Sequence, residues 1–170
     1  DKILTEEAAY KWNGGRVEPV VGLQYRNMIR YVRKTLANLK EHYPEYDEKA
    51  GYDIVGVVWF QGFNDMFDLT GRKQYGSNLV HLIKDLRSEF KSPEMKVVVG
   101  VMGVNGPHNE HNPKQKDVRE GQRSINRVSE FEGNAKAIET APLLDPRVVA
   151  LTAGGWLPEY ERDFKKDPIT

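Results

Sequence analysis

The stretch that decides the fold runs from Tyr52 to Phe60 and reads Tyr-Asp-Ile-Val-Gly-Val-Val-Trp-Phe. Its apolar residues follow one another without polar alternation, and several of them are β-branched. A run of this kind is typical of a strand that is buried on both faces, as in a parallel sheet. A second such run, Lys96–Val104, reads Lys-Val-Val-Val-Gly-Val-Met-Gly-Val. A weaker third run, Arg147–Thr152, predicts one more strand.

Helical patterns alternate with these runs. Apolar residues recur at steps of three and four from Val21 to Tyr43, and again from Tyr75 to Phe90. Residues 114–132 predict a third helix, whose apolar face is thin. The order helix, strand, helix, strand, helix, strand favours parallel strands joined by right-handed crossovers. We therefore expect an α/β fold, a three-layer sandwich around a parallel sheet, and an incomplete one because three strands make a small sheet.

Composition excludes several classes of protein. The chain has 170 residues, of which 39% are hydrophobic and 29% charged, as in a globular domain. Its 25 basic and 25 acidic side chains cancel, which disfavours nucleic acid as a partner. No cysteine is present, so disulfides, thiolate metal sites and a cysteine nucleophile are excluded. The apolar runs are shorter than the roughly 18 residues of a membrane span, so no membrane partner is expected.

The chain reads as a single partial domain. Residues 1–18 predict a lead-in loop, residues 19–156 the α/β core, and residues 157–170 a charged tail. No repeat and no convincing linker divides the sequence.

Polar loops follow the predicted strands. Ligands of parallel sheets bind beyond the carboxyl ends of the strands. The most informative loop brings together Gln61, Gly62, Asn64 and Asp65. Side-chain amides are suitable donors for a developing oxyanion, and a glycine lets the backbone turn sharply. The alternative is that these residues only form a turn, which Asn, Asp and Gly all favour.

This loop carries a family resemblance. Residues 59–66, Trp-Phe-Gln-Gly-Phe-Asn-Asp-Met, resemble the third conserved block of the SGNH hydrolases, whose core is Gly-x-Asn-Asp. More narrowly, they resemble the Trp-x-Gln-Gly stretch of the sialate O-acetylesterase-like carbohydrate esterases. The flanking residues 25–29, 51–56 and 99–104 are similar to the same group. The resemblance implies a flavodoxin-like SGNH sandwich and a serine esterase that removes acetyl groups from sugar or sialic acid hydroxyls, without a cofactor.

The resemblance also implies roles for the loop residues. Asn64 matches the oxyanion amide, and Gln61 is the alternative donor. Gly62 supplies the turn, and Asp65 is expected to brace the loop by accepting backbone N–H bonds. Phe63 departs from the pattern, because a Glu is usual at this position.

Three further residues are candidates for substrate binding. Asn105 could contact a sugar hydroxyl, because an amide both donates and accepts hydrogen bonds. His108 follows a predicted strand and could line the pocket, and Trp156 could form a ligand wall. His108 and His111 together leave open a metal-dependent hydrolase, but a metal site needs more converging ligands, so no metal is expected.

The family's nucleophile stretch, Gly-Asp-Ser or Gly-Gln-Ser, does not occur in this sequence. The five serines lie in or beside helical segments, and no His follows Trp156. We expect the central part of a carbohydrate O-acetylesterase, with the catalytic Ser and His not in this chain, or a catalytically inactive relative. The isolated chain is then inactive.

Two partners are expected on the esterase interpretation: an acetylated carbohydrate or sialic acid, and the remainder of the esterase domain. The resemblance points to a secreted or periplasmic location. The alternative interpretation is a non-catalytic carbohydrate-binding or structural domain on an esterase scaffold.

Overall fold

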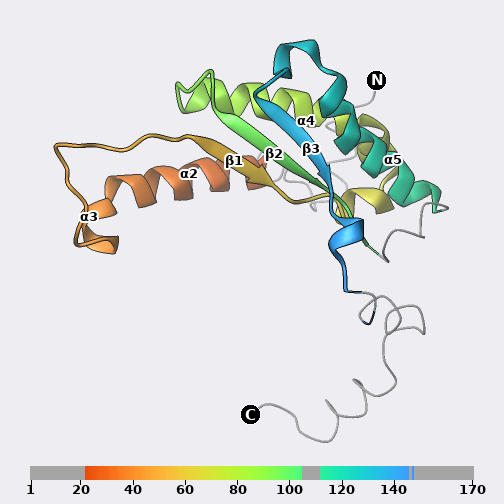
Figure 1. The fold of residues 1–170 in the computed structure, drawn as a ribbon, viewed down its shortest axis with the longest axis horizontal. Helices are drawn as coiled ribbons and strands as arrows, with labels where there is room; N and C mark the ends of the chain where they lie inside the picture. The colour runs from red at the N-terminus through yellow and green to blue at the C-terminus, as the bar shows by residue number, and fades with distance from the viewer. Residues whose placement is uncertain (1–21, 105–111, 146, 148–170) are drawn as a thin grey trace, which may run out of the picture. The chain divides into compact units, whose positions relative to one another are not determined.

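The computed structural model describes residues 22–104, 112–145 and 147 (Figure 1). The chain divides into two compact units, Asp1–Asp53 and Ile54–Thr170. Among the described residues, no helix combines the length and apolar character that crossing a bilayer requires.

The first unit contains two consecutive helices, α2 (Leu23–Ala37) and α3 (Leu39–His42). The long helix predicted before Pro44 is therefore confirmed, but it is interrupted at Asn38. The side-chain nitrogen of Asn38 donates to the carbonyl oxygen of Lys34 at 2.7 Å. Asn readily forms such local bonds to the backbone, which compete with the helical ones and explain the interruption.

The second unit is built on a three-stranded parallel sheet. Its strands are β1 (Gly56–Trp59), β2 (Lys96–Val101) and β3 (Ala135–Glu139), in the spatial order β1-β2-β3. Gly56 lies opposite Lys96, and Val97 opposite Ala135. The predicted α/β class with a parallel sheet and its first two strands are confirmed.

The third strand differs from the prediction. The predicted strand at 147–152 lies outside the described residues except for Arg147. The observed β3 reads Ala-Lys-Ala-Ile-Glu, and only its Ala137 is buried. Its outer edge is closed by a side chain, because Asn126 accepts from the Ala137 N–H at 2.8 Å and donates to the Ala137 carbonyl oxygen at 3.2 Å. Asn126 thus occupies the place where another strand would pair.

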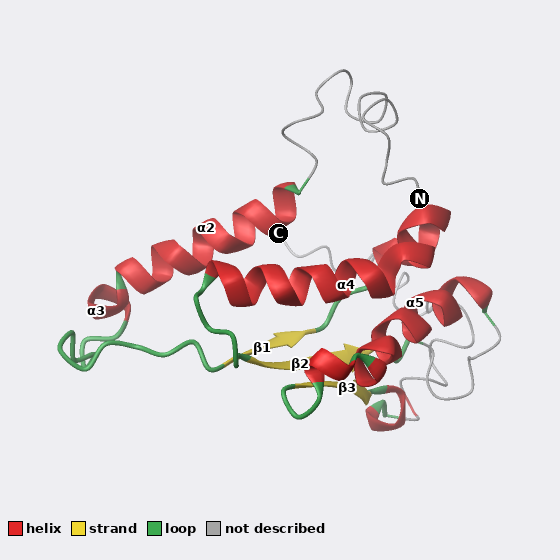
Figure 2. Cartoon of the chain, turned by 90° about the horizontal axis from the view of Figure 1, so that it is seen from above, coloured by secondary structure: helices red, strands yellow, loops and turns green. Residues whose placement is uncertain are grey.

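Helices α4 (Leu69–Glu89) and α5 (Pro113–Arg123) cover one face of the sheet (Figure 2). Two right-handed crossovers that advance in the same direction place their helices on the same side. The core lies between these layers and includes Tyr75, Leu79, Ile83, Val97, Val99, Val101, Val118, Ile125 and Phe131.

The opposite face of the sheet is open among the described residues. Val58 is 77% exposed and Ile138 46% exposed. The sandwich is therefore incomplete, with one helical layer on the sheet of this unit.

Short caps fix where the two helices begin. The Asp68 side chain accepts a hydrogen bond from the Gly71 N–H, so α4 starts well before the predicted Tyr75. The Asn112 side chain accepts from the Lys114 N–H at 3.0 Å and starts α5. Single 3-10 turns complete the unit: η1 (Asn64–Phe67), η2 (Ser124–Arg127), η3 (Ser129–Phe131) and η4 (Ala141–Leu143).

Helices α4 and α5 contact each other through a pair of glycines. A Cβ atom placed on Gly121 would lie 2.8 Å from the Gly76 nitrogen, and one placed on Gly76 would lie 3.1 Å from the Gly121 Cα. The first distance is shorter than Cβ atoms show in real proteins, and the second is tighter than most of their contacts. The absence of side chains at these two positions therefore sets the spacing of the two helices.

We expect Gly121→Ala to destabilise the chain by about 1–3 kcal/mol, because the added methyl group forces the helices apart. The free energy of unfolding in urea measures this effect. Lys116→Ala, an exposed change on the same helix, is the control and should stay within about 0.5 kcal/mol of the parent chain. Equal stability of Gly121→Ala and the parent chain would contradict the tight contact.

Candidate functional site

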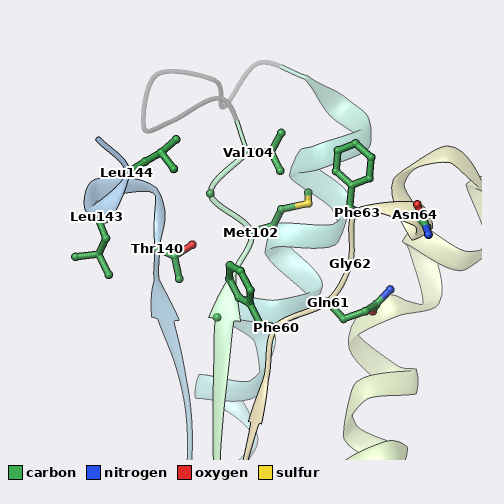
Figure 3. Close-up of a pocket in the computed structure, with 12 residues that line it drawn as sticks. Phe60, Gln61, Gly62, Phe63, Asn64, Met102, Val104, Thr140, Leu143 and Leu144 are labelled. Atoms are coloured by element: carbon green, nitrogen blue, oxygen red, sulfur yellow. The ribbon is translucent and has the colours of Figure 1, made fainter. Parts of the chain in front are cut away.

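A hollow of about 570 Å³ opens at the carboxyl ends of the strands (Figure 3). The segments that follow β1, β2 and β3 all contribute to it. This is the place where a parallel sheet is expected to bind a ligand. The lining residues are Phe60, Gln61, Gly62, Phe63, Asn64, Gly100, Met102, Gly103, Val104, Thr140, Leu143 and Leu144.

Most of the lining is apolar. The ring of Phe60 lies against Gly100, where an added Cβ would come within 2.2 Å of the ring. The hydroxyl of Thr140 donates to the Val101 carbonyl oxygen at 2.6 Å, so it is already engaged. The polar groups that remain belong to the loop after β1.

The main-chain carbonyl of Gln61 accepts two hydrogen bonds from the helical layer. The Tyr75 hydroxyl on α4 donates to it at 2.7 Å, and the side-chain nitrogen of Gln122 on α5 donates at 2.8 Å. The side-chain oxygen of Gln122 accepts from the Met102 N–H at 2.8 Å. Gln122 is fully buried, so one side chain holds together the ends of β1 and β2.

The Tyr75 hydroxyl also accepts a hydrogen bond from a residue of strand β1. The indole N–H of Trp59 donates to the Tyr75 hydroxyl oxygen at 3.1 Å, and Tyr75 is only 5% exposed. Burial raises the pKa of Tyr75 above its ordinary value, against smaller opposing effects of its hydrogen bonds with Trp59 and Gln122. The phenol therefore remains protonated at neutral pH and can donate to Gln61. Trp59 is partly buried and packs against the core.

Gly62 turns the chain in a conformation that only glycine readily adopts. Its φ is 145°, and an added Cβ would lie 2.8 Å from Val118 and 3.1 Å from the Gln122 side-chain nitrogen. Both the backbone and the packing therefore require a glycine.

Two of the residues that line the hollow, Gln61 and Asn64, carry side-chain amides. The Gln61 amide donates to the Asp65 carboxylate at 2.5 Å, and its oxygen lies 3.2 Å from the Tyr75 hydroxyl. Asp65 thus accepts a hydrogen bond from the Gln61 side chain. We expected it to accept hydrogen bonds from backbone N–H groups of the loop, but none donates to its carboxylate among the described residues. Asn64 begins η1, is exposed, and makes no side-chain hydrogen bond within the described part of the chain. Figure 3 shows Gln61 and Asn64 on the side of the loop away from Leu143.

The structure brings some of the predicted site residues together. Gln61, Gly62, Asn64 and Asp65 form one continuous loop. The other candidates, Asn105, His108, His111 and Trp156, lie outside the described residues.

Sequence reasoning missed Tyr75 and Gln122 as residues that hold this loop. Tyr75 was assigned only to an apolar stripe, and Gln122 belongs to a helix with few apolar residues. The available signal was the spacing of four residues between Val118 and Gln122, which puts both on one face of the helix.

We expect Gly62→Ala to destabilise the chain by about 2 kcal/mol or more, because strain at φ 145° adds to the clash with Val118. Urea unfolding measures the loss. The matched control is Gly133→Ala, which also has positive φ (74°) but no atom within 4 Å of an added Cβ. It should lose only about 1 kcal/mol from backbone strain. Equal losses in the two variants would show that the space at Gly62 is not restricted.

The raised pKa of Tyr75 also predicts sensitivity to alkali. The Tyr75 phenol loses its proton at a higher pH in the folded chain than in the unfolded chain. Its deprotonation therefore stabilises the unfolded chain once the pH exceeds the ordinary tyrosine pKa of about 10. The contribution of Tyr75 to the free energy of unfolding is complete below that pKa, and it is lost as the pH rises through the pKa of Tyr75 in the folded chain. We expect Tyr75→Phe to show a smaller fall in unfolding free energy between about pH 9 and 11. The exposed change Tyr52→Phe should leave the fall unchanged, and an unchanged fall in Tyr75→Phe would contradict the assignment.

Comparison with known proteins now identifies the family. A family profile described as carbohydrate esterase, sialic acid-specific acetylesterase, matches residues 7–141. A probable carbohydrate esterase of Arabidopsis thaliana is 35% identical over 62 residues, which are 36% of this chain and 24% of that relative. The chain thus spans about a quarter of the relative's length. A solved structure of an Arabidopsis thaliana protein is similar with a TM-score of 0.47 at 22% identity, over 68% of this chain and 39% of that one. Because the profile match extends over most of the sequence, the chain belongs to the sialic acid-specific acetylesterase family of carbohydrate esterases.

Proposed function

We propose that this chain supplies the oxyanion side of a site that hydrolyses O-acetyl esters on carbohydrates. The observation that carries the proposal is the loop after β1, where two amides flank a glycine turn beside an apolar hollow. Side-chain amides stabilise the negative charge that develops on an acyl oxygen when an ester is attacked. Membership of a carbohydrate esterase family supports the same chemistry.

The contacts divide the roles within the loop. Asn64 is the exposed amide whose N–H groups are available to a ligand oxygen. The Gln61 amide has one N–H on Asp65 and its oxygen toward Tyr75, so its second N–H is available with a fixed orientation. Asp65 acts here through Gln61, as a positioning residue.

We infer that the nucleophile and the base come from elsewhere. All five serines of the chain belong to the described residues, and none of them lines the hollow. Ser92 donates to the Ile54 carbonyl oxygen, and Ser124 to that of Gly121. Of the histidines, His42 and His81 are exposed on helices, and neither lines the hollow. By itself, this chain should not hydrolyse an ester.

The lack of a serine at the hollow also favours a second candidate function, a non-catalytic domain that binds acetylated carbohydrate. The two functions differ in one respect. Only the esterase requires that the amides stabilise a transition state more strongly than a bound ligand.

The esterase proposal is tested by grafting residues 60–66 into an active member of the family in place of the corresponding loop. We expect the graft to hydrolyse p-nitrophenyl acetate, and Asn64→Ala in the graft to reduce kcat by about 10²-fold, as loss of an oxyanion donor does. Phe63→Leu is the control, because it changes the same loop without removing an amide, and it should retain kcat within a few-fold.

Two results would contradict the proposal. If both Asn64→Ala and Gln61→Ala leave kcat of the graft unchanged, the loop has no oxyanion role and the binding function remains. If the 170-residue chain alone hydrolyses p-nitrophenyl acetate, the nucleophile has been wrongly placed outside it.

A further inference from the structure

The hollow at the carboxyl ends of the strands is much larger than an acetyl group. Its volume is about 570 Å³, within the roughly 300–1,000 Å³ that is typical of pockets for drug-sized ligands. An acetyl group has three non-hydrogen atoms. If each takes about the volume of a water molecule, roughly 30 Å³, the group fills about a sixth of the hollow. Most of the hollow is therefore left for other parts of a ligand.

The hollow extends across the ends of all three strands. Its lining includes Phe60 after β1, Met102 after β2, and Leu143 in η4, which follows β3. Neighbouring strands lie about 4.8 Å apart, so the ends of β1 and β3 are separated by about 10 Å. Figure 3 shows Phe60, Met102 and Val104 between the loop after β1 and the two leucines, Leu143 and Leu144. A ligand that reaches from the loop to the leucines therefore spans about 10 Å.

Two glycines near the end of β2 allow the walls of the hollow to come together. The Phe60 ring lies against Gly100 and covers the end of β2. A Cβ atom placed on Gly103 would lie 2.8 Å from the Ala141 nitrogen, so η4 packs closely on the segment after β2. This contact holds Leu143 at the hollow, although its side chain is 79% exposed. A concave apolar surface with a few polar groups at one side is typical of a ligand pocket.

The side of the hollow near the leucines offers little to a polar ligand. Among the described residues, none that lines the hollow is charged. The Thr140 hydroxyl donates to the Val101 carbonyl oxygen, and the neighbouring Leu143 and Leu144 are apolar. Burial of a sugar hydroxyl without a hydrogen-bond partner costs free energy, whereas burial of hydrocarbon is favourable. The ligand group that fits this side is therefore a hydrocarbon chain.

We propose that the hollow binds a linear acyl chain of about six to eight carbons, whose ester end lies at the loop after β1 and whose methyl end lies against Leu143 and Leu144. An extended chain with C–C bonds of about 1.5 Å advances roughly 1.3 Å per carbon, so about eight carbons span the distance to the leucines. Leu143 is then a specificity-determining residue, which favours acyl groups of medium length over acetyl. That this chain belongs to an ester substrate rests on the proposed function, but its binding can be tested without turnover.

Primary amides of increasing length are the probes, because they are uncharged and carry a stable acyl group. The 170-residue chain with ¹³C-labelled methyl groups is titrated with butanamide, hexanamide and octanamide. The affinity should rise about threefold for each added CH₂, since complete burial of one CH₂ is worth a factor of about four. The Leu143 methyl signals should move with octanamide and stay in place with butanamide, which is too short to reach them.

Leu143→Asn tests the position of the far end of the chain. Because the Leu143 side chain is largely exposed, its replacement should leave the fold intact. The affinity for octanamide should fall about fivefold, because an apolar contact is lost, while the affinity for butanamide should be unchanged. The matched control is Leu69→Asn, a change at an exposed leucine that does not line the hollow, and it should leave both affinities unchanged.

An affinity that does not increase from butanamide to octanamide would overturn the proposal, as would an equal loss for both amides in Leu143→Asn. Leu143 methyl signals that octanamide leaves unmoved would overturn it in the parent chain, without any variant. If the dependence on chain length is observed but the graft experiment fails, only the esterase function is contradicted. An active graft without this dependence would contradict only the acyl-chain site.

Discussion

A single buried amide, that of Gln122, connects the parts of this fold that form the site. It accepts from Met102 at the end of β2 and donates to Gln61 at the end of β1. Strand ends usually leave main-chain groups that need partners, and inside a protein these partners must be other protein groups or ordered water. Arg119, one helical turn earlier, continues the pattern by donating to the carbonyl oxygens of Met102 and Val104. The face of α5 toward the sheet is therefore polar at the carboxyl ends of the strands, where the chain must leave the sheet in fixed directions.

Some parts of the fold could be predicted from the sequence, and others could not. Continuous apolar runs identified β1 and β2, although the burial on both faces that such runs predict is not observed for β1, whose Val58 is 77% exposed. The loop from Gln61 to Asp65 was recognised by its residue types. The roles of Tyr75 and Gln122 could not be, because they depend on which helical turn faces which strand end, and this is set by the contact of Gly76 with Gly121. Strand β3 was missed because it is a short edge strand in which Lys136 and Glu139 interrupt the apolar residues.

The two edges of the sheet differ in a way that the strand sequences do not reveal. Asn126 closes the outer edge of β3 with a pair of hydrogen bonds that imitate a neighbouring strand. The outer edge of β1 pairs with no strand among the described residues, and Val58 of that strand exposes its side chain on the uncovered face. Parallel sheets are normally covered on both faces and bury their apolar strands. Ala137 on the β3 edge thus has a side-chain partner, whereas the β1 edge, beside the loop that carries the amides, pairs with no strand among the described residues.

The distribution of polarity around the hollow matches the chemistry of an acetyl ester. The methyl group of an acyl unit gains free energy when it leaves water for an apolar wall, which Phe60 and Leu143 provide. Its carbonyl oxygen needs a few donors at fixed positions, and their effect is greatest where no water competes. A sugar, by contrast, presents hydroxyls that need many polar partners, which the mostly apolar lining of the hollow does not offer. On the proposed function, the acyl group is therefore held in the hollow and the carbohydrate outside it, so the ester bond lies across the loop that Tyr75 and Gln122 hold in place.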